Sequence, residues 1–439
     1  MRGNEQRLKA GLDAASGIRP TRVRHIVLWM TVAAYMVTYM DRVVISVAAP
    51  SIQEEFGFSV ITMGWIFASF QIAYALFQVP GGWLGDRFGP RRALTGIVVW
   101  WSTFTAVTAL TWSAASMIVA RFLFGMGEAG AFPNATRSLS RWMLPGERGW
   151  AQGLTHAGAR LGGAITPIFV AFLILSFGWR MPFFIFAVVG LVWAAGWFWY
   201  YRDTPREHRS VNEAERDMLE AALGTSSIVK RSVPWRQLLT NPQMWLLSMM
   251  YFCYAYSINI FLTWFPNYLD DARGFDLAQM GLFASIPLMA GVVGDLAGGW
   301  ASDWLVKKEH GLTFARRSVA IVGFVTAGIT IPFAVTADDP LVSVAYFAFA
   351  VFALELTVGV SWAVTLDIGG EFAGSVSAIM NTCGNIGGAL AGVLTGYIVA
   401  ESGWEPAFYV LSGLTLFAAL IFLRIDASKP LYSVQTTSA

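Results

Sequence analysis

The sequence predicts an all-α membrane protein with twelve transmembrane helices in two pseudo-symmetric six-helix bundles. Three observations support this fold class: a very apolar composition, twelve apolar segments of spanning length, and a repeat that relates the two halves. The 439 residues are 56% hydrophobic and only 13% charged, whereas a soluble domain carries about 25% charged residues. We expect most of the outer surface to contact the lipid bilayer.

The apolar segments divide the chain into two sets of six. Each segment contains about 20 mostly apolar residues, the length that crosses a bilayer as a helix, whereas barrel strands would be short and alternating. The first set covers residues 26–49, 60–84, 93–112, 114–136, 150–174 and 181–201, and the second covers 243–268, 277–302, 317–336, 340–366, 374–398 and 406–424. The expected order is a cytoplasmic tail (1–25), a first bundle (26–201), a cytoplasmic linker (202–241), a second bundle (242–424) and a cytoplasmic tail (425–439).

A repeat relates the two sets, and loop charge orients them. The stretch GGWLGD at 81–86 recurs as GGWASD at 298–303, as in transporters built from a duplicated unit around a central site. Of the 30 Lys and Arg residues, only Arg180 and Arg273 lie in loops on the side opposite the termini. Because basic loops stay inside the cell, both termini are expected in the cytoplasm.

Composition and spacing also exclude several classes of function. The net charge of +2 does not suggest a nucleic-acid partner, and the four histidines show no spacing typical of metal ligands. Both cysteines, Cys253 and Cys383, lie in apolar segments and are interpreted as packing residues. A membrane-embedded enzyme would need a nucleophile, a metal cluster or a cofactor motif, so we expect neither catalysis, a metal nor a cofactor.

Five ionisable residues interrupt the apolar segments: Asp41, Arg42, Arg121, Glu128 and Arg160. A charge at the centre of a transmembrane helix costs about 2.5–3.5 kcal/mol on insertion scales. Arg121 and Glu128 are seven residues apart, on one helix face but about 10 Å apart along the axis, so each needs a partner elsewhere. That partner is the other carboxylate, Arg42 or a ligand. These charges either handle a polar substrate or form structural ion pairs between helices.

The loop GDRFGPRR at 85–92 joins the second and third segments and resembles the loop signature of the major facilitator superfamily. In that family the loop contributes to the cytoplasmic gate. The resemblance therefore implies that Asp86, Arg87 and Arg91 are gate residues, with Asp303 as the counterpart in the second half. The alternative is a short basic loop without a gating role.

A finer resemblance is to the anion:cation symporter family, which includes sialin and bacterial galactonate, glucarate and hexuronate carriers. The matching stretches are YMDRVVISVAAPSI (39–52), RFLFGMGEAGAFPNA (121–135), WFPNYL (264–269) and the run from Trp362 through NTCGN (381–385). This resemblance implies that Asp41 and Glu128 couple transport to protons. It also implies that Arg42 and Arg121 lie near the substrate path, with Arg121 contacting a substrate carboxylate.

Arg160 departs from the family pattern, because related sugar-acid carriers often have a glutamine near this position. A planar guanidinium can hold a carboxylate with two hydrogen bonds, so a further arginine suits a diacid. Alternatively, Arg160 neutralises Glu128 or Asp41, or extends toward the cytoplasmic edge.

Several uncharged polar side chains are candidates for lining the same cavity. Hydroxyl-rich substrates need such donors and acceptors, although each of these residues could instead make a hydrogen bond between helices. By position, Tyr74 and Asn381 resemble polar cavity residues of the sugar-acid carriers. The candidate substrate-binding residues of this kind are Gln71, Tyr74, Asn259, Trp362 and Asn381.

Together these features predict proton-coupled symport of an organic anion, such as an aldonate, aldarate or hexuronate, by alternating access. Three arginines and two carboxylates leave an interior charge of +1, and each proton bound by a carboxylate would favour an anion further. Sodium coupling, exchange and proton-driven efflux of a small acid remain alternatives. We expect a monomer in a bacterial inner membrane.

Overall fold

The computed structural model describes residues 19–144, 147–223 and 234–431, apart from the side chains of residues 86, 149 and 371. Its regular elements in these ranges are all helical, as predicted. The first half contains α2 (Val23–Phe56), α3 (Val60–Ala109), α4 (Ala114–Glu128), α5 (Ala131–Trp142), α6 (Arg148–Phe177) and α7 (Arg180–Tyr200). Then come η2 (Pro205–Glu207), α8 (Glu213–Leu223) and α9 (Trp235–Thr240). The second half contains α10 (Pro242–Thr263), α11 (Phe265–Asp271), α12 (Leu277–Lys307), α13 (Leu312–Thr336), α14 (Pro340–Gly369), η3 (Gly370–Phe372), α15 (Ala373–Ser402) and α16 (Trp404–Phe422).

Twelve spans arise from these elements because α3 is two helices joined at a tight turn. Gly89 has φ 79° and ψ 152° inside α3, a conformation that favours glycine, and Pro90 starts the next helix. The described chain has 11 helices long and apolar enough to cross a membrane, counting only residues 60–85 of α3. The part of α3 after Gly89, residues 90–109, is the twelfth span. The predicted all-α, twelve-helix architecture is confirmed.

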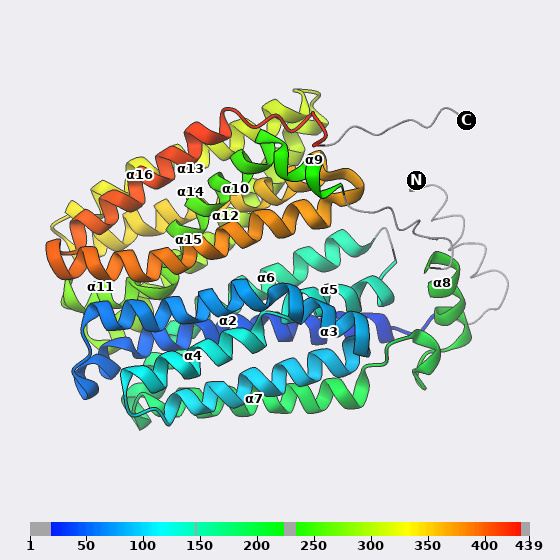
Figure 1. Cartoon of the computed structure of the whole chain (residues 1–439), viewed down its shortest axis with the longest axis horizontal. Helices are drawn as coiled ribbons and strands as arrows, with labels where there is room; N and C mark the ends of the chain where they lie inside the picture. Colours follow the sequence, from blue (N-terminus) through cyan, green and yellow to red (C-terminus); the bar gives the residue numbers. More distant parts are fainter. Residues whose placement is uncertain (1–18, 145–146, 224–233, 432–439) are drawn as a thin grey trace.

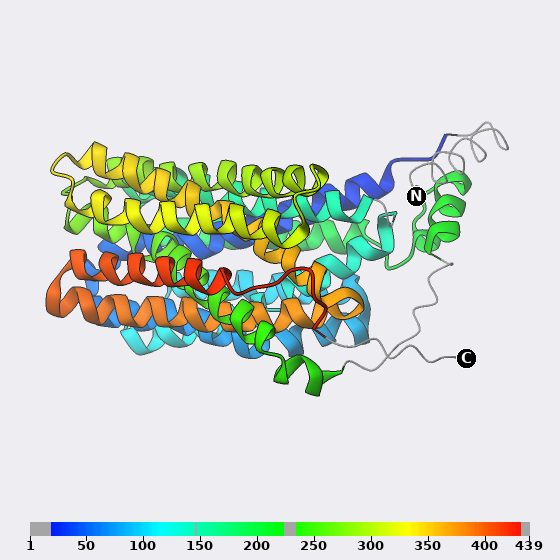
Figure 2. The same ribbon diagram turned by 90° about the horizontal axis from the view of Figure 1, so that it is seen from above.

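The helices form two bundles that lie side by side (Figures 1 and 2). Helices α2–α7 make the first bundle and α10–α16 make the second. The bundles meet chiefly where α3 packs against α15 and where α6 packs against α12. We call the end that carries α8, where the described residues begin at residue 19 and end at residue 431, the termini end, and the opposite end the far end.

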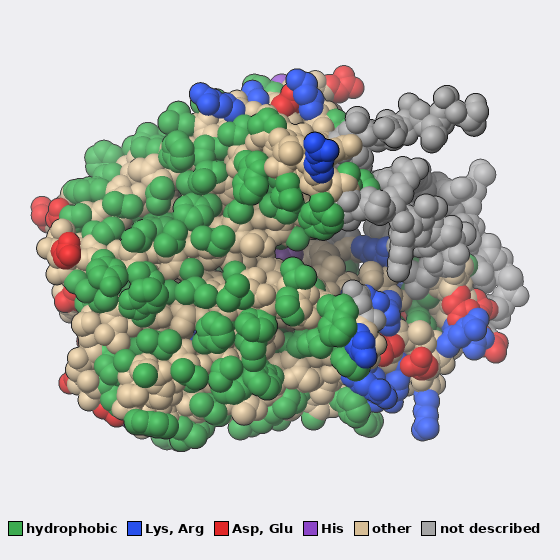
Figure 3. All heavy atoms as spheres, in the orientation of Figure 1, with side chains coloured by type: hydrophobic (Ala, Val, Ile, Leu, Met, Phe, Trp, Pro, Cys, Tyr) green, Lys and Arg blue, Asp and Glu red, His purple; other side chains and the backbone are tan. Residues whose placement is uncertain are grey.

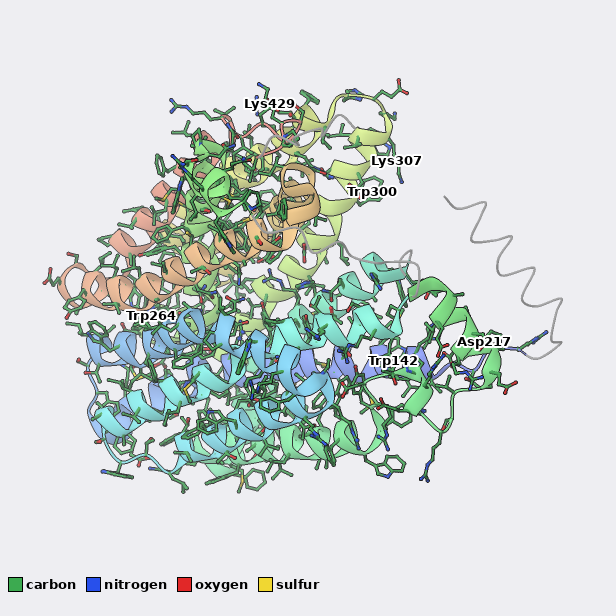
Figure 4. The ribbon with its side chains drawn as sticks, turned by 45° about the vertical axis from the view of Figure 1, so that its right-hand side comes forward. Trp142, Asp217, Trp264, Trp300, Lys307 and Lys429 are labelled. Atoms are coloured by element: carbon green, nitrogen blue, oxygen red, sulfur yellow. The ribbon has the colours of Figure 1, made fainter. Side chains whose placement is uncertain are left out.

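The bundles are in close contact at the far end. A Cβ atom added to Gly64 of α3 would lie 2.6 Å from the carbonyl oxygen of Gly392 in α15, so this backbone approach requires glycine. Nearby, Asn267 donates a hydrogen bond of 2.6 Å to Gln53 across the junction. Figure 4 places Trp264 where the two bundles meet, and this side chain is fully buried.

At the termini end the bundles diverge, and the space-filling view is hollowed between them (Figure 3). The same view shows side chains that are mostly hydrophobic around the middle of the molecule and charged at its two ends. Part of the expected linker folds onto the first bundle: the buried carboxylate of Glu215 in α8 accepts hydrogen bonds from the backbone N–H groups of Val23 and Arg24. Because these are unpaired donors at the start of α2, a carboxylate is favourable there.

Candidate functional site

A cavity of about 120 Å³ lies at the middle of the molecule between the two bundles. Three of its lining side chains are arginines, Arg42, Arg121 and Arg160, and no carboxylate is among its lining residues. Three of the predicted uncharged residues, Gln71, Asn259 and Asn381, also line it. The structure thus brings residues from six helices around one space: α2, α3, α4, α6, α10 and α15.

Arg42 is paired with a carboxylate that the chain supplies from another helix. Its Nε lies 2.5 Å from Oε1 of Glu128, a fully buried side chain, so Glu128 finds Arg42, one of the partners considered from the sequence. The guanidinium of Arg42 also lies over the ring of Tyr74, 4.7 Å from its centroid. Tyr74 is buried behind Arg42 and does not line the cavity, so it supports this arginine instead of reaching the space itself.

Arg121 lines the cavity with donors to spare. Its guanidinium lies over the ring of Phe124, 4.3 Å from the centroid, and its side chain is buried. Nε and Nη1 have no hydrogen-bond partner among the described residues. Unpaired buried donors are costly, so this guanidinium has capacity for further hydrogen bonds.

Asp41 lies behind the arginines. Its side chain is fully buried, within Coulombic reach of Arg121 and Glu128. Thr105 donates a long hydrogen bond of 3.4 Å to Oδ1, and Oδ2 has no partner in the described part of the chain. An ionised carboxylate with an unpaired oxygen is costly to bury.

Arg160 pairs with neither Glu128 nor Asp41. Its Nη2 lies 3.0 Å from Oε2 of Glu355, which belongs to the second bundle. The same nitrogen donates to the hydroxyl of Tyr254 at 3.0 Å.

Glu355 was missing from the set of interior charges expected from the sequence, and so was Asp295, which lies near it within α12. Both residues interrupt predicted apolar segments, 340–366 and 277–302, so the criterion that identified the other five would also have found them. The interior therefore holds three arginines and four carboxylates, a charge of −1 with every group ionised. The expected value of +1 was wrong.

The uncharged residues connect the bundles. Gln71 of α3 donates to Asn259 of α10 at 2.5 Å, and Asn381 of α15 donates to Gln78 of α3 at 3.3 Å. Trp362 instead donates from its indole nitrogen to the hydroxyl of Tyr251 at 3.1 Å and does not line the cavity.

The tyrosines of the cavity were not predicted. Tyr39, Tyr251 and Tyr254 all line it. Isolated tyrosines in apolar helices carry no spacing signal that separates cavity residues from packing residues.

The predicted gate residues lie at the termini end, and each described one contacts its own bundle. Arg91 donates to the carbonyl oxygen of Phe198, while Arg87 lies over the ring of its neighbour Phe88. The side chain of Asp86 lies outside the described residues.

In the second bundle, Asp303 forms an ion pair of 2.9 Å with Arg316. Arg316 also pairs with Asp367 at 2.9 Å. These ion pairs are internal to the second bundle.

Comparison with known proteins adds sequence relatives and structural neighbours. The family model of the Major Facilitator Superfamily matches residues 31–392 and 313–438. The chain is 40% identical over 418 residues to the probable sulfoacetate transporter SauU of Cupriavidus necator, covering 94% of this chain and 96% of the relative. It is 34% identical over 403 residues to the hexuronate transporter of Bacillus subtilis, covering 91% of this chain and 93% of the relative. A crystal structure of a bacterial homologue of the human lysosomal transporter Spinster, inward-facing and unoccupied, superimposes with a TM-score of 0.70 at 19% identity, covering 93% and 96%.

Proposed function

The chain belongs to the Major Facilitator Superfamily and is a multi-span transporter, and from this premise we propose that it carries a small organic anion together with protons by alternating access. One observation carries the proposal: three arginines line a central cavity, no carboxylate is among its lining residues, and Glu128 and Glu355 pair with two of the arginines. An anion entering the cavity would meet guanidinium groups first.

Among the three arginines, we assign binding of the substrate's carboxylate to Arg121. Its free Nε and Nη1 donors can hold a carboxylate with two charge-assisted hydrogen bonds. Gln71, Asn259 and Asn381 supply amides for hydroxyl groups or a second acidic group. The cavity of about 120 Å³ is smaller than the roughly 300–1,000 Å³ typical of sites for drug-sized ligands, which favours a small acid.

The relatives narrow the chemistry of the substrate. One is named a sulfoacetate transporter and another a hexuronate transporter, and both compounds carry a carboxylate. We propose a substrate of this kind, either a sugar acid or a short acid with a sulfonate.

Proton coupling is assigned to Asp41 and Glu128. With all four interior carboxylates ionised the interior charge is −1, which opposes an anion. A proton on either residue makes the interior neutral and a second makes it positive, so protons and anion favour each other's binding by linkage. Glu128 would release Arg42 when it binds a proton, since their contact is the ion pair of 2.5 Å.

Alternating access follows from the two-bundle arrangement. We propose that the bundles rock about the cavity, as in transporters with related halves. The basic loops at the termini end favour a cytoplasmic location of both termini, so this state would open to the cytoplasm. Asp303 and the arginines of the 85–92 loop would exchange partners as the two bundles come together at the termini end. The bacterial relatives favour the inner membrane of a bacterium.

The test is uptake of labelled sulfoacetate and galacturonate by proteoliposomes. An inward proton gradient should drive accumulation of at least one of them, and Glu128→Gln and Asp41→Asn should remove that dependence while exchange of internal for external substrate persists. Glu401→Gln changes one exposed carboxylate at the far end and serves as the control. Accumulation that follows a sodium gradient, or that survives both substitutions, would contradict the coupling assignment.

A further inference from the structure

The ion pair between Arg160 and Glu355 differs from the pair of Arg42 and Glu128 because it joins the two bundles. Arg160 belongs to α6 and Glu355 to α14. Tyr254 of α10 completes the group: its hydroxyl accepts a hydrogen bond from Nη2 of Arg160 at 3.0 Å and donates one to Oε1 of Glu355 at 2.9 Å. Tyr254 therefore bridges the two charged side chains, while Oε2 of Glu355 is held by the ion pair with Arg160 and accepts no hydrogen bond from the described residues.

Glu355 sits where two helices pack closely. A Cβ atom added to Gly291 of α12 would lie 3.1 Å from Cγ of Glu355, and one added to Gly294 would lie 3.2 Å from its Cβ. The side chain of Glu355 is 1% exposed, so water has little access to replace Arg160 as its partner. Because an unpaired ionised carboxylate is costly to bury, Glu355 needs either Arg160 or a proton.

The surroundings of Glu355 hold one further carboxylate and one cation. Asp295 adds negative charge on the side of α12, and the remaining groups are neutral hydroxyls and an imidazole. The titratable and charged residues around the pair are Arg160, His156, Tyr39, Tyr251, Tyr254 and Asp295. If Arg160 paired with another anion instead, Glu355 and Asp295 would therefore be left near each other without a cation.

Of the three arginines that line the cavity, Arg42 is paired with Glu128, and the other two are in different states. Arg121 lines the cavity and has two donors without a partner among the described residues, whereas the guanidinium of Arg160 is already paired with Glu355 and hydrogen-bonded to Tyr254. A first acidic group can bind Arg121 directly. A second acidic group can bind Arg160 only by displacing Glu355.

We propose that Arg160 and Glu355 form a proton-gated second anion subsite, so that the cavity takes a two-headed dianion with one acidic group at Arg121 and the other at Arg160. This inference rests on the proposed function and specifies its substrate class. The displaced Glu355 takes one proton from solvent and becomes a neutral acid, and no other bond changes. By linkage, binding of a dianion takes up one proton more than binding of a monoanion at Arg121 alone.

The proposal is tested by counting protons during binding to the purified full-length protein. Calorimetric titrations in two buffers of different ionisation enthalpy give the protons taken up with sulfoacetate, a dianion, and with galacturonate, a monoanion. In the wild type we expect one more proton to be taken up with sulfoacetate than with galacturonate. For each unit that the pH rises, the affinity for sulfoacetate should therefore fall by about tenfold more than the affinity for galacturonate. In Glu355→Gln the extra proton should disappear while sulfoacetate still binds, and Glu401→Gln should behave as the wild type.

The outcomes separate this inference from the proposed function. Equal proton numbers for the two anions in the wild type, or an extra proton that persists in Glu355→Gln, would overturn the subsite while leaving anion transport intact. Failure of the wild type to bind either anion would overturn the proposed function, and the subsite with it. If Glu355→Gln does not fold, equal proton numbers for the two anions in the wild type would still overturn the subsite.

Discussion

Removing Arg160 should destabilise the protein more than removing the charge of its partner. In Arg160→Met, Glu355 is 1% exposed and has lost its cation, so it must either stay ionised without a partner or take up a proton; breaking a buried pair in this way costs about 3–5 kcal/mol. In Glu355→Gln, the amide can keep the hydrogen bond from Tyr254, and Arg160 is 18% exposed at the cavity wall. The expected cost is then about 1–3 kcal/mol.

The double variant, Arg160→Met with Glu355→Gln, tests whether the two effects share one cause. It contains no unpaired charge, so it should be more stable than Arg160→Met alone by about 1–3 kcal/mol, the usual range for coupled neighbours. Arg160→Met with Glu401→Gln is the matched control and should show no such recovery.

Unfolding can be followed in mixed micelles of increasing denaturing detergent with a thiol-reactive dye, because Cys253 is buried in the folded protein. Free energies of the two single variants that add within about 0.5 kcal/mol in the double variant would refute the reasoning. Equal stability of the two single variants would also refute it.

Three further predictions concern other parts of the molecule. Arg121→Ala should weaken binding of sulfoacetate by at least roughly 10–150-fold, the equivalent of losing one of its two charged hydrogen bonds at about 1.5–3 kcal/mol each. Arg121→Lys should recover only part of the affinity, because an ammonium group lacks the planar pair of donors that binds both carboxylate oxygens. Titration calorimetry checks both variants, and unchanged affinity in Arg121→Ala would refute the assignment. Gly64→Val should separate the bundles at the far end, because its Cβ would lie 2.6 Å from the carbonyl oxygen of Gly392. Distances between spin labels placed at the far ends of the two bundles should lengthen, and an unchanged distance distribution would contradict the predicted clash. Arg316→Gln should lower the unfolding midpoint, because it leaves Asp367 without its ion-pair partner at 2.9 Å. Adding Asp367→Asn to this variant should restore part of the loss. An unfolding midpoint of Arg316→Gln equal to that of the wild type would show that this ion pair adds no stability.

Several features of the site could be predicted from the sequence because their cause is local. A charged residue inside an apolar run is visible in the sequence, and its cost in a bilayer marks it as functional or paired. Arg42, Arg121 and Arg160 were identified in this way, and the structure places all three on one cavity. Glu355 and Asp295 obey the same rule, and they were missed because two segments were treated as uniformly apolar.

The partners of these charges could not be predicted. Arg42 and Glu128 are 86 residues apart, and Arg160 and Glu355 lie in different bundles, so only the packing of helices decides which atoms meet. The spacing of Arg121 and Glu128 excluded a pair within one helix but left their partners open. The structure shows Glu128 paired with Arg42 and Arg121 with two donors that have no partner among the described residues.

The sequence by itself determined the membrane fold, because a bilayer core without water demands apolar segments of a set length whose backbone bonds are internal. Tertiary structure alone decided which arginine is available and which is already bonded. That difference depends on contacts of about 3 Å between helices far apart in the chain, and helical periodicity in one segment contains no information on what the facing segment presents.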